Sequence, residues 1–213
     1  MKQRMIRFVR GLAHADSGVA MTELAFSMPI LMLMALTGAE LCNYITTRMR
    51  ISQVALHLAD NAARMGNGSQ LSSKTITETD INDLLTGGGM QAGELDLYNR
   101  GRVVISSFER NDNGNGNVYK VGWQRCRGSA TYTPQFGTQG VTSNNGMGPS
   151  GRQVIAMSDN ATMFVEVFYQ YRPLVGSTLV PQLNFTEIAS MAVRDRRDMT
   201  RIYNTANATV SSC

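Results

Sequence analysis

Apolar residues are concentrated near the N-terminus of the chain. Residues 24–39 read LAFSMPILMLMALTGA and include no charged side chain. Together with its flanks, this apolar run extends from Val19 to Ile45. An α-helix of that length measures roughly 40 Å, which is enough to cross the hydrocarbon core of a bilayer and both of its interfaces. The pattern predicts one transmembrane segment over about residues 19–45.

Helical spacing of apolar residues continues beyond this segment. They recur every three or four positions: Ile51, Val54, Ala55, Leu58, Ala62 and Met65. The sequence Gly-Asn-Gly at 66–68 then interrupts the pattern. We therefore expect one continuous helix over residues 19–65, whose first half lies in the membrane and whose outer half carries an exported domain over residues 66–213.

The start of the exported domain combines a helical signal with an alternating one. Residues 77–85 begin with Thr-Glu-Thr-Asp, a helix start, and are expected to form a short helix that the glycines at 87–89 end. In residues 94–97 two leucines alternate with two acidic residues, as they would in a strand.

Four later segments have the character of β-strands: 103–108, 118–123, 163–171 and about 185–193. The first two are joined by ERNDNGNGN, whose Asn-Gly steps favour a hairpin turn. The expected fold is α+β, with a long N-terminal helix packed on an antiparallel β-sheet of about four or five strands. The segment Gly128–Asn160 is rich in Gly, Ser, Thr and Asn, and predicts a long loop that is either an exposed recognition surface or a poorly ordered insertion.

The formal net charge of +4 comes mostly from the N-terminus. Residues 1–18 sum to +3, since they include four basic residues and one acidic residue: Lys2, Arg4, Arg7, Arg10 and Asp16. This basic leader, and not a binding surface, explains the charge, so we expect no nucleic-acid partner. Positive charge before the span also favours a cytoplasmic N-terminus. These features predict a single-pass membrane protein whose C-terminal domain lies outside the cytoplasmic membrane.

Glu23 is unusual because a carboxylate in a membrane helix costs about 2.5–3.5 kcal/mol at the bilayer centre, and less near an end. Its position is explained if the chain is cut between Gly18 and Val19. Val19 would then carry the new α-amino group, and Glu23 would lie one helical turn away. In an assembly, the carboxylate could instead neutralise the amine of a neighbouring subunit. The alternative is a glutamate at the membrane edge that reaches the headgroups.

Residues 17–31, SGVAMTELAFSMPIL, resemble the N-terminus of TadE-like proteins, which are minor pilins or pseudopilins of tight-adherence (Flp, type IVc) pilus systems. The match includes Gly18 before the cut, Glu23 as the fifth mature residue, Pro29, and Glu40 at the end of the apolar run. The sequence departs from the family after Glu40, where Leu-Cys stands in place of the common Phe-Gly. The resemblance implies cleavage by a prepilin peptidase. It also implies that the span lies in the bacterial inner membrane with the domain in the periplasm, and that the protein acts, with other pilin subunits and the Tad assembly machinery, in a pilus for surface adhesion.

Common catalytic and nucleotide-binding motifs do not occur in the sequence, which has neither GxSxG, GxxxxGK[ST] nor HExxH. The two histidines are His14 in the leader and His57 on the long helix. We therefore expect no enzymatic activity, no catalytic residue, no metal and no cofactor. A basic cluster near the C-terminus interleaves with Asp195 and Asp198 and is expected to be a solvated, self-paired terminus: Arg194, Arg196, Arg197 and Arg201.

The three cysteines are too far apart for a local metal or redox motif. Cys42 lies at the end of the apolar run and is interpreted as a small buried apolar residue. Cys126 and Cys213 are the natural pair for a disulfide in an exported domain, and two free thiols are the alternative.

Two other functions fit the sequence. One is a signal-anchored single-pass envelope protein with a binding domain, which would keep its leader, whereas a pilin loses residues 1–18. The other is a pseudopilin of a type II secretion system, which only the family resemblance separates from a Tad pilin.

Overall fold

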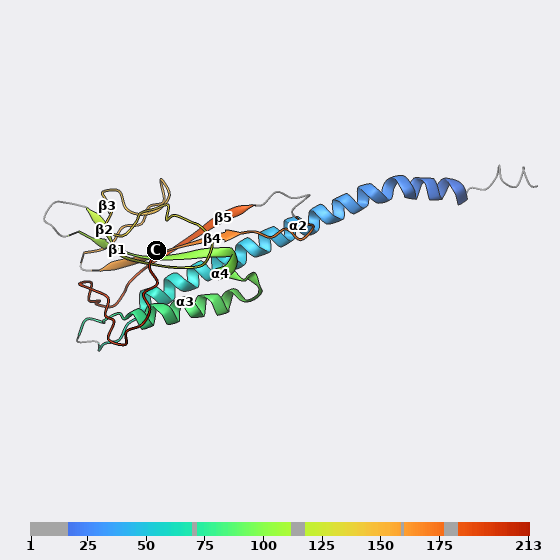
Figure 1. Cartoon of the computed structure of the whole chain (residues 1–213). Helices are drawn as coiled ribbons and strands as arrows, with labels where there is room; N and C mark the ends of the chain where they lie inside the picture. Colours follow the sequence, from blue (N-terminus) through green and yellow to red (C-terminus); the bar gives the residue numbers. More distant parts are fainter. Residues whose placement is uncertain (1–16, 70–71, 112–117, 159, 177–182) are drawn as a thin grey trace, which may run out of the picture.

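Helix α2 (Ser17–Arg64) protrudes from one end of the molecule, and the remaining elements fold around its C-terminal half (Figure 1). The computed structural model describes residues 17–69, 72–111, 118–158, 160–176 and 183–213. Helix α2 confirms the continuous helix that the sequence predicts over residues 19–65, with bounds that differ by one or two residues. Nearly all of the predicted leader lies outside the described residues.

Five antiparallel strands form one sheet in the order β3-β2-β1-β4-β5. Their bounds are β1 Gly101–Arg110, β2 Tyr119–Arg127, β3 Thr142–Ser143, β4 Ala161–Gln170 and β5 Asn184–Ala192. The fold is α+β, with the long helix packed on the sheet, as the sequence predicts. The four predicted strand segments correspond to β1, β2, β4 and β5, and the first two pair with each other as expected. The Asn-Gly turn predicted between them lies outside the described residues.

The face of the sheet that lies on α2 forms the main core. Helix α3 (Glu78–Ala92) packs beside α2 on this same side. The residues that meet here come from both helices and from alternate positions of the central strands: Ile51, Val54, Leu58, Ile81, Leu85, Val103, Ile105 and Val165. Removing their apolar surface from water, at about 25 cal/mol per Å², is the main contribution of this core to stability.

Residues 128–158 cover the opposite face of the sheet. Phe108 of β1 and Phe164 of β4 form a second core there with Met147 and Ala156 of this segment. The segment also pairs with β2 through β3. The described part of the predicted loop is therefore a second layer on the sheet, because its apolar residues cover aromatic side chains that would otherwise face water.

Helix α3 runs through the three glycines that the sequence predicts as its end, so that prediction is wrong. The helix begins with a capping box between Thr77 and Asp80, as its start signal indicates. It continues past the glycines because Gly88 lies against α2, where a Cβ would come within 2.7 Å of Leu58 Cδ2. Close packing of the two helices here outweighs the low helix propensity of glycine.

Residues 93–100 form helical turns and not the strand that their alternation predicts. They consist of the 3₁₀ turn η1 (Gly93–Leu95) and the short helix α4 (Leu97–Arg100). Asp96 between them has a φ of 50°, in the left-handed region, which breaks an extended backbone. Four alternating residues are too few to specify a strand against such local turns.

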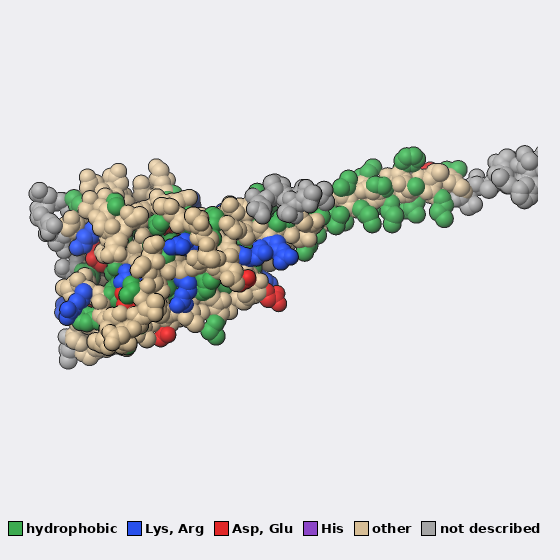
Figure 2. All heavy atoms as spheres, in the orientation of Figure 1, with side chains coloured by type: hydrophobic (Ala, Val, Ile, Leu, Met, Phe, Trp, Pro, Cys, Tyr) green, Lys and Arg blue, Asp and Glu red, His purple; other side chains and the backbone are tan. Residues whose placement is uncertain are grey.

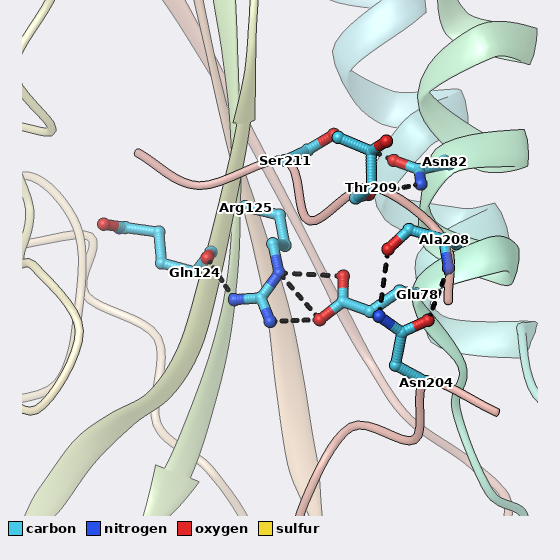
Figure 3. Close-up of polar contacts among 8 residues, drawn as sticks. All are labelled: Glu78, Asn82, Gln124, Arg125, Asn204, Ala208, Thr209 and Ser211. Atoms are coloured by element: carbon cyan, nitrogen blue, oxygen red, sulfur yellow. Dashed lines mark hydrogen bonds and ion pairs between the residues drawn. The ribbon is translucent and has the colours of Figure 1, made fainter. Parts of the chain in front are cut away.

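The C-terminal tail is tied to α3, and α3 is tied to β2 (Figure 3). Asn82 Nδ2 donates to the Thr209 carbonyl at 2.7 Å, and Ser211 Oγ donates to Asn82 Oδ1 at 2.8 Å. Beside this contact the guanidinium of Arg125 points at the Glu78 carboxylate, with Nε 3.0 Å from Oε2. The side chains of this ion pair are only 13% and 4% exposed, so it is largely shielded from solvent.

A disulfide joins Cys126 of β2 to Cys213, which is the pairing that the sequence favours. The amide of Cys126 also donates to the Ser211 carbonyl at 2.8 Å. The tail is therefore held on the edge of the domain by both covalent and hydrogen bonds.

Arg197 is buried, which contradicts the expectation of a solvated and self-paired terminus. Its Nη2 donates to three carbonyl oxygens at the end of α2, those of Ala62, Ala63 and Met65, at 3.0, 3.1 and 2.9 Å. A cation at this end of a helix satisfies carbonyls that have no partner within the helix and complements the helix dipole. Burial lowers the pKa of Arg197 to about 10, so the side chain stays charged at neutral pH. Asp195 pairs instead with Lys74, with 2.6 Å between Oδ2 and Nζ.

Candidate membrane segment and its junction with the domain

The N-terminal half of α2 exposes a long apolar surface. Every residue from Gly18 to Ala39 is exposed, and Figure 2 shows apolar side chains around the protruding helix. Within the described part of the chain, α2 is the one helix long and apolar enough to cross a membrane, and no residue of its most apolar stretch is buried. Residues 18–39 measure roughly 33 Å as a helix, close to the thickness of a hydrocarbon core. This half of α2 is therefore a candidate membrane span.

The polar groups within this segment are compatible with a hydrocarbon environment. The hydroxyls of Thr22, Ser27 and Thr37 each donate to a carbonyl three or four residues earlier, at 2.8, 3.2 and 2.7 Å. Such bonds satisfy the hydroxyls without water. Pro29 removes one amide donor from the helix, which is a substitution that membrane helices tolerate.

Glu23 is the one ionisable side chain between Gly18 and Ala39, and it is exposed in the second turn of α2. Gly18 and Val19 precede it in the first turn. A Cβ on Gly18 would meet no atom within 4 Å, and the φ of Gly18 is not positive. Nothing in the fold of the described chain therefore requires glycine at this position.

The junction of α2 with the domain centres on Glu40, whose side chain is buried. Oε1 accepts from the Tyr171 hydroxyl at 2.6 Å, and Oε2 accepts from the amides of Leu174 and Val175 at 2.8 and 3.0 Å. These donors follow β4 directly, so the carboxylate fastens the segment after β4 to the helix. A buried carboxylate is costly unless such donors replace its hydration, and here three of them do.

Aromatic packing continues this junction along the next turn of α2. Asn43 Nδ2 donates to the Tyr171 hydroxyl at 2.7 Å. The ring of Tyr44 lies edge-on to the rings of Tyr171 and Phe185, with centroids 5.1 and 5.8 Å apart. The part of α2 that is exposed on all sides thus ends at Ala39, inside the range predicted as the span.

Cys42 is exposed, which corrects its interpretation as a buried apolar residue. The residues of α2 that face the domain here are Glu40, Asn43, Tyr44 and Thr47, at positions i, i+3, i+4 and i+7. Positions on one face of a helix recur at this spacing, so Cys42 lies on a different face.

Two further acidic side chains are buried inside the domain, and burial raises the pKa of both. Glu166 of β4 accepts from the Tyr132 hydroxyl at 2.7 Å and from the Gln135 amide at 3.0 Å, which holds the covering segment on the sheet. Glu109 of β1 accepts from Ser107 Oγ at 2.8 Å. Their contacts are structural, and no group of three or more His, Cys, Asp or Glu that could hold a metal ion occurs among the described residues.

The site residues predicted from the sequence fall into two separate groups. Gly18, Val19 and Glu23 lie near the free end of α2, whereas Cys126 and Cys213 form the disulfide within the domain. The structure does not bring the two groups together. Comparisons of the chain with protein-family models, with curated proteins and with solved structures find no match. A functional proposal therefore rests on the residues of this chain.

Proposed function

We propose that this protein is a minor pilin or pseudopilin that takes part in assembling a Tad/Flp-type pilus for surface adhesion. Before assembly it spans the bacterial inner membrane once, with the N-terminus in the cytoplasm and the domain in the periplasm. The observation that carries the proposal is the exposed apolar part of α2, residues 18–39, in which Glu23 near the N-terminal end is the single carboxylate. The resemblance of residues 17–31 to TadE-like proteins supports the same function.

The chemistry of assembly follows from charge neutralisation. Cleavage between Gly18 and Val19 by a prepilin peptidase creates an α-amino group one turn from Glu23. An isolated carboxylate in hydrocarbon is unfavourable, whereas a carboxylate beside an amine of a neighbouring subunit is neutralised. Glu23 therefore favours the packing of subunit helices over the isolated helix.

The junction at Glu40 gives this helix a mechanical connection to the domain. The carboxylate of Glu40 holds the amides of Leu174 and Val175 against α2. When the Tad assembly machinery moves the apolar helix, the domain moves with it as one body. The partners in this function are therefore other pilin subunits, which contact α2, and the machinery that extracts the helix from the membrane.

Replacement of Glu23 by alanine in cells that express the complete pilus system tests the proposal. Insertion should be unchanged, because the variant removes a costly carboxylate, and alkaline extraction of membranes measures it. Co-purification with other pilin subunits should be lost. Thr22→Val is the matched control in the same turn, and should co-purify normally. If Glu23→Ala also co-purifies normally and piliation is unaffected, the assembly role of Glu23 is wrong.

A further inference from the structure

A positively charged groove lies between α2 and the end of β4, near the point where α2 leaves the domain. Its volume is about 290 Å³. The residues that line it come from α2, from α4 and from the end of β4 and the segment after it: Asn43, Thr46, Arg50, Arg100, Tyr169 and Arg172. Three arginines and one glutamate, Glu94, line the groove, so the formal excess is two positive charges.

Two of the three arginines are available to a ligand. Arg100 interacts with the hydroxyl of Tyr169. Arg50 and Arg172 are exposed, and neither makes a side-chain hydrogen bond or an ion pair within the described part of the chain. Arg48, which is also on α2, is by contrast already paired: its Nε lies 2.6 Å from Oε1 of Glu187 in β5. Unpaired guanidinium groups beside hydroxyl and amide donors form a site suited to a phosphate group.

The groove lies at the level of the membrane surface if residues 18–39 span the bilayer. Asn43 is about 6 Å beyond Ala39 along the helix, and the polar interface of a bilayer is roughly 5–7 Å thick on each side. Arg172 lies at the same level, because the adjacent Tyr171 bonds both Glu40 and Asn43. Arg50 lies about 10 Å further along the helix than Asn43, at the outer end of the same groove. Its side chain leans toward the N-terminus of the helix, which here is the membrane side.

We propose that this groove binds the phosphate of an anionic phospholipid headgroup in the leaflet that faces the domain. The inference rests on the membrane-spanning part of the proposed function and is independent of pilus assembly. Arginines on the exported side of a span run against the usual bias of basic residues toward the cytoplasm, and a headgroup site gives Arg50 and Arg172 a local role. A bound headgroup would fix the depth of α2 in the membrane before the subunit is extracted.

The full chain in lipid nanodiscs provides the test. Nanodiscs contain equal amounts of phosphatidylcholine and phosphatidylglycerol, and native mass spectrometry measures the ratio of the two lipids that stay bound to the protein. The double variant R50Q/R172Q removes both free arginines. The control R152Q/R196Q makes the same change of charge at exposed positions in loops outside the groove. Each arginine near a charged bilayer surface contributes a factor of about five, so R50Q/R172Q should lower the preference for phosphatidylglycerol by up to about 25-fold.

The control should keep the preference of the natural chain. R50K/R172K keeps both charges but loses the planar guanidinium groups, so its preference should fall between those of the natural chain and of R50Q/R172Q. If R50Q/R172Q fails to fold, the single variants R50Q and R172Q decide the matter: an unchanged preference in both, or a loss of the preference in the control, overturns the inference. Equal losses in R50Q/R172Q and R152Q/R196Q would show diffuse attraction and no groove site. If the protein binds inorganic phosphate in phosphatidylcholine nanodiscs and shows no preference between the two lipids, the groove binds a soluble anion and the headgroup assignment is wrong.

Two remaining outcomes separate this inference from the function on which it rests. If R50Q/R172Q leaves lipid binding unchanged but disrupts association between copies in the same discs, the groove binds protein and the headgroup assignment is wrong. If the chain does not insert into nanodiscs at all, the membrane span itself is wrong and the inference fails with it.

Discussion

Glu40→Gln tests how the protruding helix is held by the domain. The substitution keeps the size of the side chain but removes its charge and one of its two acceptor oxygens. In the structure the carboxylate accepts three hydrogen bonds, from the Tyr171 hydroxyl and from the amides of Leu174 and Val175. A glutamine can retain at most the bonds to its single oxygen, and its NH₂ group would face the remaining donors.

The size of the effect follows from these contacts. A hydrogen bond to a charged group contributes about 1.5–3 kcal/mol, and a buried donor left unpaired costs about 1–3 kcal/mol. Since part of the network survives, we expect a local loss of about 2–3 kcal/mol. A change of this size raises the population of the locally opened state by roughly 30- to 150-fold, at a factor of ten for each 1.4 kcal/mol.

Native-state hydrogen exchange of the full chain in detergent micelles measures this opening directly. The amides of Leu174 and Val175 should lose protection by the factor given above, whereas amides in the centre of the sheet should change little. Glu94→Gln, which removes the same charge from an exposed residue, is the control and should leave both amides protected. Unchanged protection of Leu174 and Val175 in Glu40→Gln would refute the role of this carboxylate at the junction.

Other predictions concern the domain, and each is measured on the full chain in detergent micelles. Gly88→Ala should lower the free energy of unfolding by about 1–3 kcal/mol, because the added Cβ would press on Leu58 of α2. A Cβ on Gly87 would meet no atom within 4 Å, so Gly87→Ala should raise the free energy of unfolding by about 0.5–1 kcal/mol. Equal thermal melts of the two variants would contradict both expectations. Arg197→Met leaves buried carbonyls at the end of α2 unpaired and should cost at least about 1–3 kcal/mol, and an unchanged melt would show that this cap is dispensable. Replacing Cys126 and Cys213 by serine should cost about 4–5 kcal/mol for a sequence separation of 87. Peptide mapping of periplasmic protein without reduction should find this bond, and two alkylated thiols would exclude it.

The features predicted correctly from the sequence are those that a local pattern specifies. The apolar repeat of α2 continues over many turns, and the β1–β2 hairpin combines alternating residues with an Asn-Gly loop, so each segment carries its own evidence. The glycines of α3 misled the prediction, because helix propensity is a weak signal and contact between Gly88 and Leu58 decides the outcome.

The roles of Glu40 and Arg197 could not be predicted because their partners are distant in sequence. Glu40 bonds residues 131 to 135 positions away, and Arg197 bonds carbonyls 132 to 135 positions away. The neighbouring residues in the chain place Glu40 only at the end of an apolar run, and they predict that Arg197 belongs to a solvated basic cluster. The sequence does contain one signal for Glu40: a carboxylate next to an apolar run is costly to bury, so it needs hydrogen-bond donors from another part of the fold.

The N-terminus of the mature protein tests the proposed function most directly. Intact-mass analysis of the envelope fraction, from cells with an active prepilin peptidase, measures whether the leader is removed. The pilin proposal predicts a chain that has lost residues 1–18 and begins at Val19, with Glu23 as its fifth residue. A mature protein that still begins at Met1 would contradict it, and would favour a signal-anchored envelope protein that keeps its leader and does not polymerise.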